Sequence, residues 1–470
     1  MLQALWLVFS FRYAMLYDES YHYGAINFFS QTWNPSPSEQ PTSFDTSGLL
    51  IYSNASLYHY IMAIPFRIIS FVTTDFTAQI IALRLLNVLL AVSTLFIFRS
   101  LLLRMDVKKS IINISLFVYT LLPITSLLSA TVSYDNAVIP LTGLFLLFGV
   151  RVLVADKKDI LRSSYLFLLV GILAALMKFT FLPVFVAGVV FILFKSFIPQ
   201  NKKYLASFKQ LLRKKGLIYV SLLVLPIILL GYVGIARYGV GVLRYGSVLP
   251  DCKVVIGKER CDKLNYYRET EELKATKDER KSMSVDDYLF NWANKMTTRF
   301  DTTGIQIPDG PGKYDDQFAR KLPLLSLLIT AGVITTFFCS VFMLHRFISD
   351  KRWQLIVFSG LFLAVTLFVF NILSYYSANE NLNVQVRYLL GFVPVIIAFG
   401  LMSMDIMIKR RAVKTVGFVV LLLIASQGAG VMKHIASAKD SWYWQNGTVV
   451  KVNQNTKQAV RLWLHEADGK

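Results

Sequence analysis

Long apolar runs recur from one end of the chain to the other, and they limit what the chain can fold into. Hydrophobic residues make up 55% of the sequence and charged residues only 17%, below the roughly 25% that is usual in soluble domains. Apolar runs of this length cross a bilayer as helices, because lipid offers no hydrogen-bond partner to an unpaired backbone group. The sequence therefore predicts an all-α polytopic membrane protein. No small-residue cleavage site follows the first run, so we expect no cleavable signal peptide.

The apolar runs predict eleven transmembrane helices. We place them near residues 1–16, 79–103, 111–130, 136–154, 163–177, 180–197, 217–236, 322–344, 354–376, 388–407 and 413–431. The first run is short, since 16 residues reach only about 24 Å at 1.5 Å per residue. The segment 57–72, LYHYIMAIPFRIISFV, is also short, is broken by Pro65 and carries His59 and Arg67. We expect this segment to be interfacial or re-entrant.

The positive charge of the chain indicates how the chain is oriented in the membrane. The formal net charge is +20, and most of the surplus lies in short loops that separate alternate pairs of predicted spans. Short loops rich in lysine and arginine stay in the cytoplasm. The charge is therefore explained by topology, and a nucleic-acid partner is not expected. We expect an integral, multi-pass protein of a bacterial-type plasma membrane, with its active site on the extracytoplasmic face.

The same rule predicts a hairpin between residues 163 and 197. Basic loops flank this stretch on both sides, so an even number of crossings must lie between them. The stretch should fold as two short helices that turn near MKFTFLP, where Pro183 interrupts the hydrogen-bond ladder. This turn would place Lys178 close to the outer face.

The predicted topology divides the chain into four parts. These are an N-terminal transmembrane module with a first outer loop at 17–78 (1–236), an extracytoplasmic loop (237–321), C-terminal transmembrane helices (322–431) and an extracytoplasmic tail (432–470). Cys252 and Cys261 both fall in the large outer loop, where a disulfide can persist. We expect that disulfide; the alternative is two unrelated free thiols.

The stretch YDESYHYG follows the first apolar run directly and places Asp18, Glu19 and His22 at the predicted outer surface. One interpretation is structural: Asp18 caps a helix that starts here, and Glu19 favours its positive end. The other is chemical, because His22 shares a helical face with both carboxylates at spacings of three and four. Such a set could supply a general base or a hard metal site.

Three more ionisable residues are predicted at the outer ends of spans. They are Asp135 in SATVSYDNAVIP, Lys178 at the hairpin turn, and Arg387 beside Tyr388 in NVQVRYLLGFVPV. Each alone could be a loop residue or a snorkelling cation. Ionisable side chains in a membrane cost free energy, so three of them at the same membrane surface indicate a functional site. Two carboxylates and two cations at one level suit an anionic lipid headgroup and a proton acceptor.

Several short motifs, in their order along the chain, resemble the C-type glycosyltransferases. These multispanning enzymes use polyprenyl-phosphate sugars and include protein O-mannosyltransferases and the aminoarabinose transferases of lipid A. The acidic DE after the first span, ASLYHYIMAIPFRII, LRLLNVLLAVSTLFIF, VSYDN, LAALMKFTFLPV and VRYLLGFVPVI are each similar to a motif of that family. In this chain Lys178 is followed by Phe-Thr, where the family usually has a glycine and a proline.

The resemblance implies an inverting sugar transfer from a polyprenyl-phosphate donor to a lipid, glycan or protein acceptor on the outer face. It implies Asp18 as the general base, with Glu19 orienting it or holding a metal. Lys178 and Arg387 would stabilise the departing phosphate. We also assign Asp135, His22, His59 and Tyr388 to the substrate site. A divalent metal ion is a possible cofactor of the family but is not required by a phosphate leaving group.

Two other classes of protein remain as alternatives. A transporter or lipid flippase often shows two-fold repeats with matching broken helices, and the sequence contains no matching halves. The predicted charges also gather near one surface rather than at the midplane, which favours an enzyme supplied from one side. A non-catalytic membrane scaffold would require Asp18 and Lys178 to be dispensable.

Overall fold

A computed structural model shows how the apolar runs are arranged. It describes residues 1–34, 56–156, 159–248, 250–262, 265–280, 282–299, 304–308, 314–318, 349–379, 384–410 and 438–463, with a few single positions between 411 and 438. The predicted spans 322–344 and 413–431 lie outside the described residues, apart from three single positions in the second.

Helices dominate the described part of the chain. The first half contains α1 (Leu2–Ser10), α2 (Glu19–Ser30), α3 (Leu57–Val72), α4 (Phe76–Arg104), α5 (Lys109–Leu121), α6 (Pro123–Ser129), α7 (Asp135–Val154), α8 (Ile160–Met177), η2 (Phe179–Phe181), α9 (Leu182–Ile192), η3 (Leu193–Phe197) and α10 (Asn201–Gly234). The second half contains η4 (Ile235–Gly239), α11 (Val240–Tyr245), α12 (Cys252–Ile256), α13 (Lys258–Asp262), α14 (Asn265–Ala275), η5 (Lys277–Glu279), α15 (Val285–Thr298), β1 (Gly304–Pro308), β2 (Tyr314–Phe318), α17 (Lys351–Ala378), η7 (Val386–Leu389), α18 (Val393–Met407), η8 (Asp440–Trp442) and α21 (Gly447–Trp463).

The prediction of a polytopic helical membrane protein is confirmed, but the count of eleven spans is not. Within the described residues, six helices are long and apolar enough to cross a membrane, or seven if α5 and α6 form one span bent by 71°. The helix in the first apolar run, α1, has only 9 residues and reaches about 14 Å. It is therefore too short to cross the roughly 30 Å hydrocarbon core by itself.

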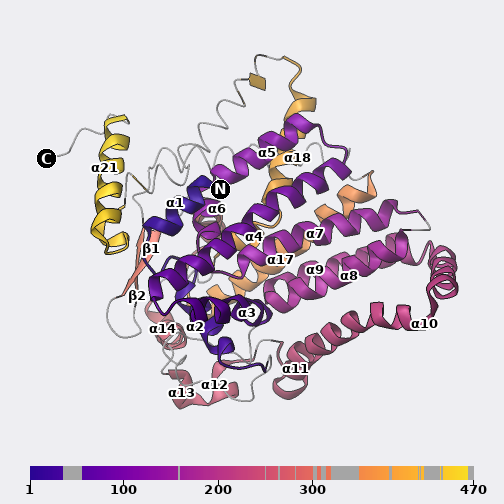
Figure 1. Cartoon of the computed structure of the whole chain (residues 1–470), viewed down its shortest axis with the longest axis horizontal. Coiled ribbons are helices and arrows are strands. Elements are labelled where there is room, and N and C mark those ends of the chain that lie inside the picture. Colours follow the sequence, from indigo (N-terminus) through magenta and orange to yellow (C-terminus); the bar gives the residue numbers. More distant parts are fainter. Residues whose placement is uncertain are drawn as a thin grey trace.

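The long helices α4, α7, α8, α9 and α17 lie side by side in a bundle (Figure 1). Helix α7 packs between α4 and α8, and it is the most buried of the candidate spans. The predicted hairpin is confirmed: α8 ends at Met177, and α9 begins with Pro183 in its first turn after a short 3-10 segment. Lys178 therefore lies at the turn.

The basic loops lie together at one end of the bundle. Arg352, at the start of α17, donates to Asp106 after α4 at 2.7 Å. Lys108, before α5, pairs with Asp405 near the end of α18 at 2.6 Å. These contacts join the loops that the sequence places on the same side of the membrane.

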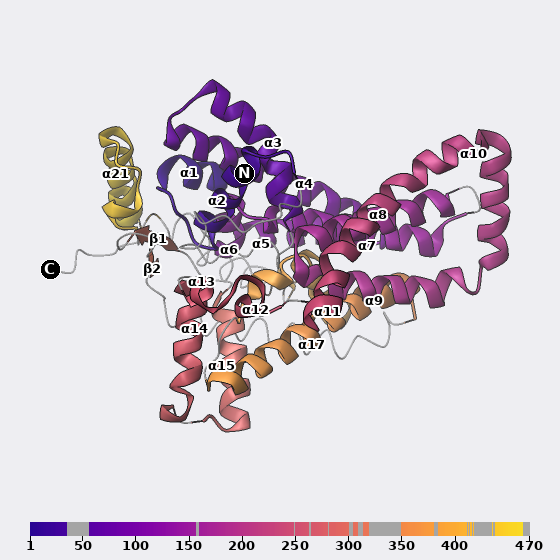
Figure 2. The ribbon, with the colours of Figure 1, turned by 90° about the horizontal axis from the view of Figure 1, so that it is seen from below.

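The opposite end carries the shorter elements. Helices α1 to α3, the antiparallel pair of β1 and β2, and the cluster of α12 to α15 all lie there (Figures 1 and 2). Cys252 and Cys261 form a disulfide that joins α12 to α13, with 5.7 Å between their Cα atoms.

Helix α3 has two apolar faces. One face buries residues such as Tyr58 and Phe66, and the helix packs against α2. The other leaves a stripe of apolar side chains exposed: Ile61, Ile64, Ile68, Phe71 and Val72. The helix is continuous through Pro65, and its 16 residues reach only about 24 Å, so it is too short to cross the bilayer by itself.

Candidate active site

Asp18 and Arg387, separated by 369 positions in the chain, meet in an ion pair. Helix α2 begins at Glu19, as the sequence predicts, but the Asp18 side chain makes no capping hydrogen bond. Tyr17 and Asp18 instead adopt left-handed backbone angles, with φ of 69° and 64°, which non-glycine residues rarely adopt. Asp18 Oδ2 accepts a hydrogen bond from Arg387 Nη2 at 2.8 Å. The Asp18 side chain is still 52% exposed, so it can be reached from outside.

Asp135 joins both predicted cations in the interior. It is the first residue of α7, and its carboxylate forms a buried ion pair with the ammonium of Lys178. Arg387 Nε lies 4.0 Å from Asp135 Oδ2. The ammonium also lies between two aromatic rings, 4.4 Å from the centre of Tyr134 and 4.3 Å from the centre of Tyr388. Aromatic faces of this kind stabilise a cation that burial has removed from water.

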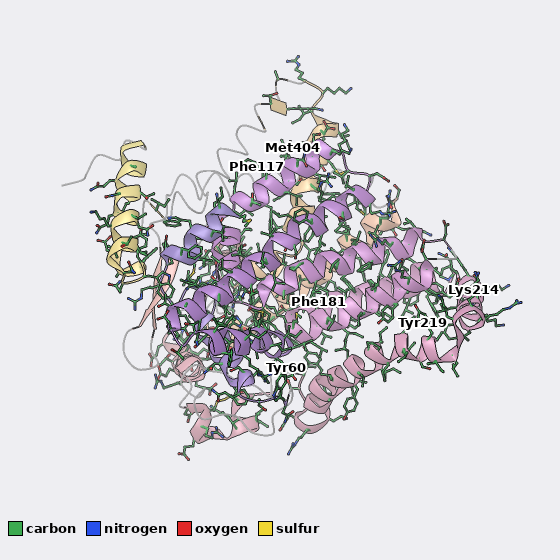
Figure 3. The ribbon with its side chains drawn as sticks, in the orientation of Figure 1. Tyr60, Phe117, Phe181, Lys214, Tyr219 and Met404 are labelled. Carbon is green, nitrogen blue, oxygen red and sulfur yellow. A yellow bond between two sulfur atoms is a disulfide. The ribbon has the colours of Figure 1, made fainter. Side chains whose placement is uncertain are left out.

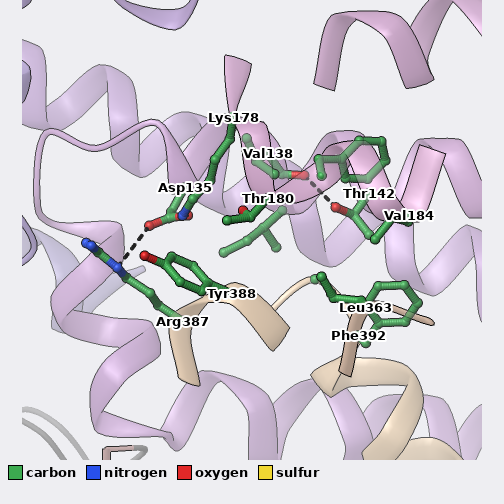
Figure 4. A pocket seen from close by; sticks show the side chains of 13 residues that line it. Asp135, Val138, Thr142, Lys178, Thr180, Val184, Leu363, Arg387, Tyr388 and Phe392 are labelled. Carbon is green, nitrogen blue, oxygen red and sulfur yellow. Dashed lines mark hydrogen bonds and ion pairs between the residues drawn. The ribbon is translucent and has the colours of Figure 1, made fainter. Parts of the chain in front are cut away.

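Four of these residues line a small pocket (Figure 4). Asp135, Lys178, Arg387 and Tyr388 form its charged side, and apolar side chains such as Phe392 form the other. The volume is about 20 Å³, enough for one water molecule. Gly391 permits the close approach of its segment to α7, because a Cβ at this position would lie 2.9 Å from Thr142.

The pocket and its surroundings hold an unusual number of buried polar atoms with no hydrogen-bond partner. Eleven such side-chain atoms occur among the described residues, and five belong to four neighbours: Tyr17 Oη, His22 Nε2, Asp135 Oδ2, Arg387 Nε and Arg387 Nη1. Burial raises the pKa of the Tyr17 hydroxyl, so it remains a neutral donor. Since an unpaired buried polar atom is costly, these atoms need a polar partner from outside the chain, either water or a ligand.

Glu19 has different surroundings from Asp18. It is completely buried and accepts two hydrogen bonds from Arg84, at 2.8 and 2.7 Å. Its oxygens also accept from the backbone N–H groups of Met15 and Val132. Arg84, on α4, donates in turn to the carbonyl oxygens of Phe11 and the residue after it. This buried pair ties α4 to the segment before α2 and to the segment before α7.

The residues that could form a metal site do not converge on one point. Both oxygens of Glu19 are occupied by Arg84 and backbone donors, and His22 is bonded to another histidine. In the part of the chain that the structure describes, no group of three or more histidine, cysteine or acidic residues could hold a metal ion. Asp18, Glu19 and His22 therefore do not form the shared ligand set that their spacing in the sequence allows.

His22 and His59 form a buried stacked pair. His22 Nδ1 lies 2.9 Å from His59 Nε2, and the two rings are nearly parallel. The ring of Tyr134 separates this pair from Lys178, with its centre 4.4 Å from that of His22. Burial lowers the pKa of His22 well below its ordinary value, and His59, Arg387 and Lys178 lower it further. Neither histidine lines the pocket.

The buried His22 should make the protein less stable in acid. In the unfolded chain a histidine binds a proton below about pH 6.5, whereas folded His22 stays neutral. Below that pH the unfolded state therefore binds the extra proton, and stability falls by up to about 1.4 kcal/mol per pH unit. Thermal unfolding between pH 7.5 and 5.5 should show a shallower pH dependence for His22→Gln than for the wild type. An unchanged slope would contradict this account.

The structure brings together most of the predicted site residues, and it adds others. Asp18, Asp135, Lys178, Arg387 and Tyr388 meet, while Glu19, His22 and His59 lie behind them. Arg84 and Tyr134 were not singled out from the sequence. Arg84 could have been found, because a single cation inside the apolar run IALRLLN requires a buried partner. Tyr134 gives no such signal, since the chain has 23 tyrosines.

Among known proteins, only solved structures match this chain, and they match it in fold. No protein-family model matches the sequence, and no curated protein does. Two crystal structures of ArnT from Cupriavidus metallidurans are similar in fold, one in the apo state and one bound to undecaprenyl phosphate. They have 9% and 12% sequence identity and TM-scores of 0.47 and 0.48, and each match covers 99% of this chain and 71% of the ArnT chain. ArnT is a C-type glycosyltransferase, the class that the sequence motifs resemble.

Proposed function

We propose that this integral membrane protein is a glycosyltransferase that moves a sugar from a polyprenyl-phosphate donor to an acceptor on the extracytoplasmic face. One observation carries the proposal. An accessible carboxylate, Asp18, pairs with the buried Arg387, and Asp135 links Arg387 to a second buried cation, Lys178. This combination provides a proton acceptor next to a site for a phosphate.

In the proposed reaction Asp18 acts as the general base. The acceptor oxygen attacks the anomeric carbon of the sugar while its proton passes to the Asp18 carboxylate. The bond between that carbon and the phosphate oxygen breaks, and polyprenyl phosphate leaves, so the configuration at the anomeric carbon inverts. The exposure of Asp18 supports this role, because an acceptor that arrives from outside can reach it.

Lys178 and Arg387 are proposed to bind the phosphate and to stabilise the charge that develops on it. The Arg387 side chain is only 7% exposed, and its Nε and Nη1 have no hydrogen-bond partner. Each of these two N–H groups can donate to a phosphate oxygen, and a hydrogen bond from a guanidinium to an anion is stronger than one between neutral groups. Preorganised donors of this kind usually make the largest contribution to catalysis.

Glu19 is proposed to act as a positioning residue. Its pair with Arg84 is fully buried and anchors the segments on either side of the site. Asp18 is the preceding residue, and its left-handed backbone requires such an anchor.

The large loop that contains the disulfide is proposed to face an oxidising compartment, which supports an extracytoplasmic active site. The host membrane is proposed to be a bacterial-type plasma membrane, and the acceptor a lipid, a glycan or a protein. A nucleic acid is not among the proposed partners.

Purified protein in proteoliposomes tests the proposal with polyprenyl-phosphate monosaccharides that carry a labelled sugar. We expect release of polyprenyl phosphate, with label transferred to an added acceptor or slowly to water. Lys178→Met and Arg387→Met should abolish most of this release, whereas Lys108→Met, at the opposite end of the bundle, should not. Labelled donor that crosses the membrane chemically unchanged would instead support a flippase and overturn the proposal.

A further inference from the structure

Helix α10 consists of two different parts. Gly216 interrupts it with φ of 79° and ψ of 167°. The part after Gly216 is apolar, while residues 201–215, which we term the basic helix, have the sequence NKKYLASFKQLLRKK. Figure 2 shows the basic helix running across the direction of the spanning helices, at the end of the molecule away from α1 and α2. A helix in this position lies roughly in the plane of the membrane surface.

One face of the basic helix is fixed to the bundle. Tyr204 and Ser207 are buried on this face. Tyr204 Oη lies 3.1 Å from Ser196 Oγ and 3.3 Å from Ser164 Oγ. Lys203 donates to the carbonyl oxygen of Ala155 after α7. These contacts determine which sides of the helix face outward.

The free sides of the basic helix are apolar and cationic. Leu205 is 55% exposed and Phe208 is 41% exposed. At 100° per residue these two side chains and Leu212 fall on one side of the helix. Five cations are exposed: Lys202, Lys209, Arg213, Lys214 and Lys215. The first three fall together on the adjoining side. Figure 3 shows Lys214 at the far end of the molecule. The basic helix contains no acidic residue.

Membrane orientation alone does not explain this arrangement. Orientation requires positive charge near a span, but it does not require exposed leucine and phenylalanine beside that charge. Apolar side chains flanked by lysine and arginine on one helix are typical of helices that lie in the headgroup layer. A negatively charged lipid surface is complementary to both features, because its headgroups attract the cations and its acyl region accepts the apolar residues.

We propose that the basic helix is a binding site for anionic phospholipid in the leaflet opposite the charged pocket. Leu205 and Phe208 insert between the lipids, and Lys202, Lys209, Arg213 and Lys214 contact the phosphate groups. Binding is then electrostatic in part and weakens as salt screens the charges. The proposal does not depend on the transferase activity.

Hydrogen exchange of the full-length protein in nanodiscs tests the proposal. Exchange in peptides from 201–215 should be at least threefold slower in nanodiscs with 30% phosphatidylglycerol than in nanodiscs of phosphatidylcholine alone. The quadruple variant Lys202→Gln, Lys209→Gln, Arg213→Gln and Lys214→Gln should lose this difference. A control with the same loss of charge at the same end, Arg99→Gln, Lys109→Gln, Lys351→Gln and Lys409→Gln, should keep it.

Peptides from α7 and α8 provide the folding check, since their exchange should be equal in all three proteins. Equal exchange of the basic helix in both lipids would overturn the proposal. A quadruple variant that responds to phosphatidylglycerol as strongly as the wild type would also overturn it.

Discussion

Asp18→Asn is expected to lower the turnover of sugar transfer by about 10² to 10⁴-fold, the usual contribution of a general base. Asparagine has nearly the same size and can still accept a hydrogen bond from Arg387 Nη2, which lies 2.8 Å from Asp18 in the wild type. It cannot take a proton from the acceptor. The donor should therefore bind with nearly unchanged affinity, and the loss should fall on kcat. Initial rates at saturating labelled donor in proteoliposomes measure the effect.

Asp75→Asn provides the matched control for this variant. Asp75 is an exposed carboxylate that caps α4 by accepting from the backbone N–H of Ala78 at 2.7 Å. Asparagine caps a helix as well as aspartate does, so this variant should fold and turn over normally. A folded Asp18→Asn protein that transfers sugar at the wild-type rate would remove Asp18 from the mechanism.

Breaking the buried Glu19–Arg84 pair should destabilise the protein severely. Arg84→Met leaves the Glu19 carboxylate buried with two backbone donors and no cation. Removing one partner of a buried ion pair typically costs about 3–5 kcal/mol. Arg84→Lys should restore only part of this, because an ammonium lacks the two parallel N–H groups with which the guanidinium meets both oxygens. Thermal unfolding in detergent measures each variant.

A double-mutant cycle measures the interaction free energy between Glu19 and Arg84 apart from their contacts with other groups. Glu19→Gln and Arg84→Met together should destabilise the protein by less than the sum of the single changes, because the double variant contains no unpaired charge. Lys108→Met, which breaks an exposed pair with Asp405, should cost less than about 1 kcal/mol. Additive and equally small effects for Glu19 and Arg84 would contradict the proposed anchor. Single variants that remain folded should also show a lower kcat if the pair positions Asp18.

The sequence predicted the positions of the charged residues because membrane topology constrains them. Two basic loops around residues 163–197 required an even number of crossings, and this parity placed Lys178 at a turn on the same side as Asp135 and Arg387. The parity rule uses only apolar length and charge, so it needs no knowledge of which helices touch. The rule therefore predicted the side of the membrane on which the pocket residues lie, but not which of them contact one another.

The partners of the buried residues could not be predicted in the same way. Glu19 and Asp18 are adjacent in the chain, yet one faces Arg84 in the interior and the other faces Arg387 near the surface. Their directions depend on left-handed backbone angles that the sequence does not signal at non-glycine residues. The pairing of His22 with His59 likewise depends on how α2 packs against α3. The first apolar run was assigned as a span on its apolar character although it is short, and its helix ends at Ser10.

If the proposed polyprenyl-phosphate donor binds in the pocket, the ion pair of Asp135 with Lys178 has a consequence for its entry and exit. With room for only one water molecule, the pocket cannot admit a phosphate while the two side chains remain joined. The incoming anion must displace the carboxylate, and the carboxylate can return when the product leaves. On this proposal Asp135 is a resident substitute for the negative charge of the substrate, and the ammonium of Lys178 has a carboxylate partner in the resting protein.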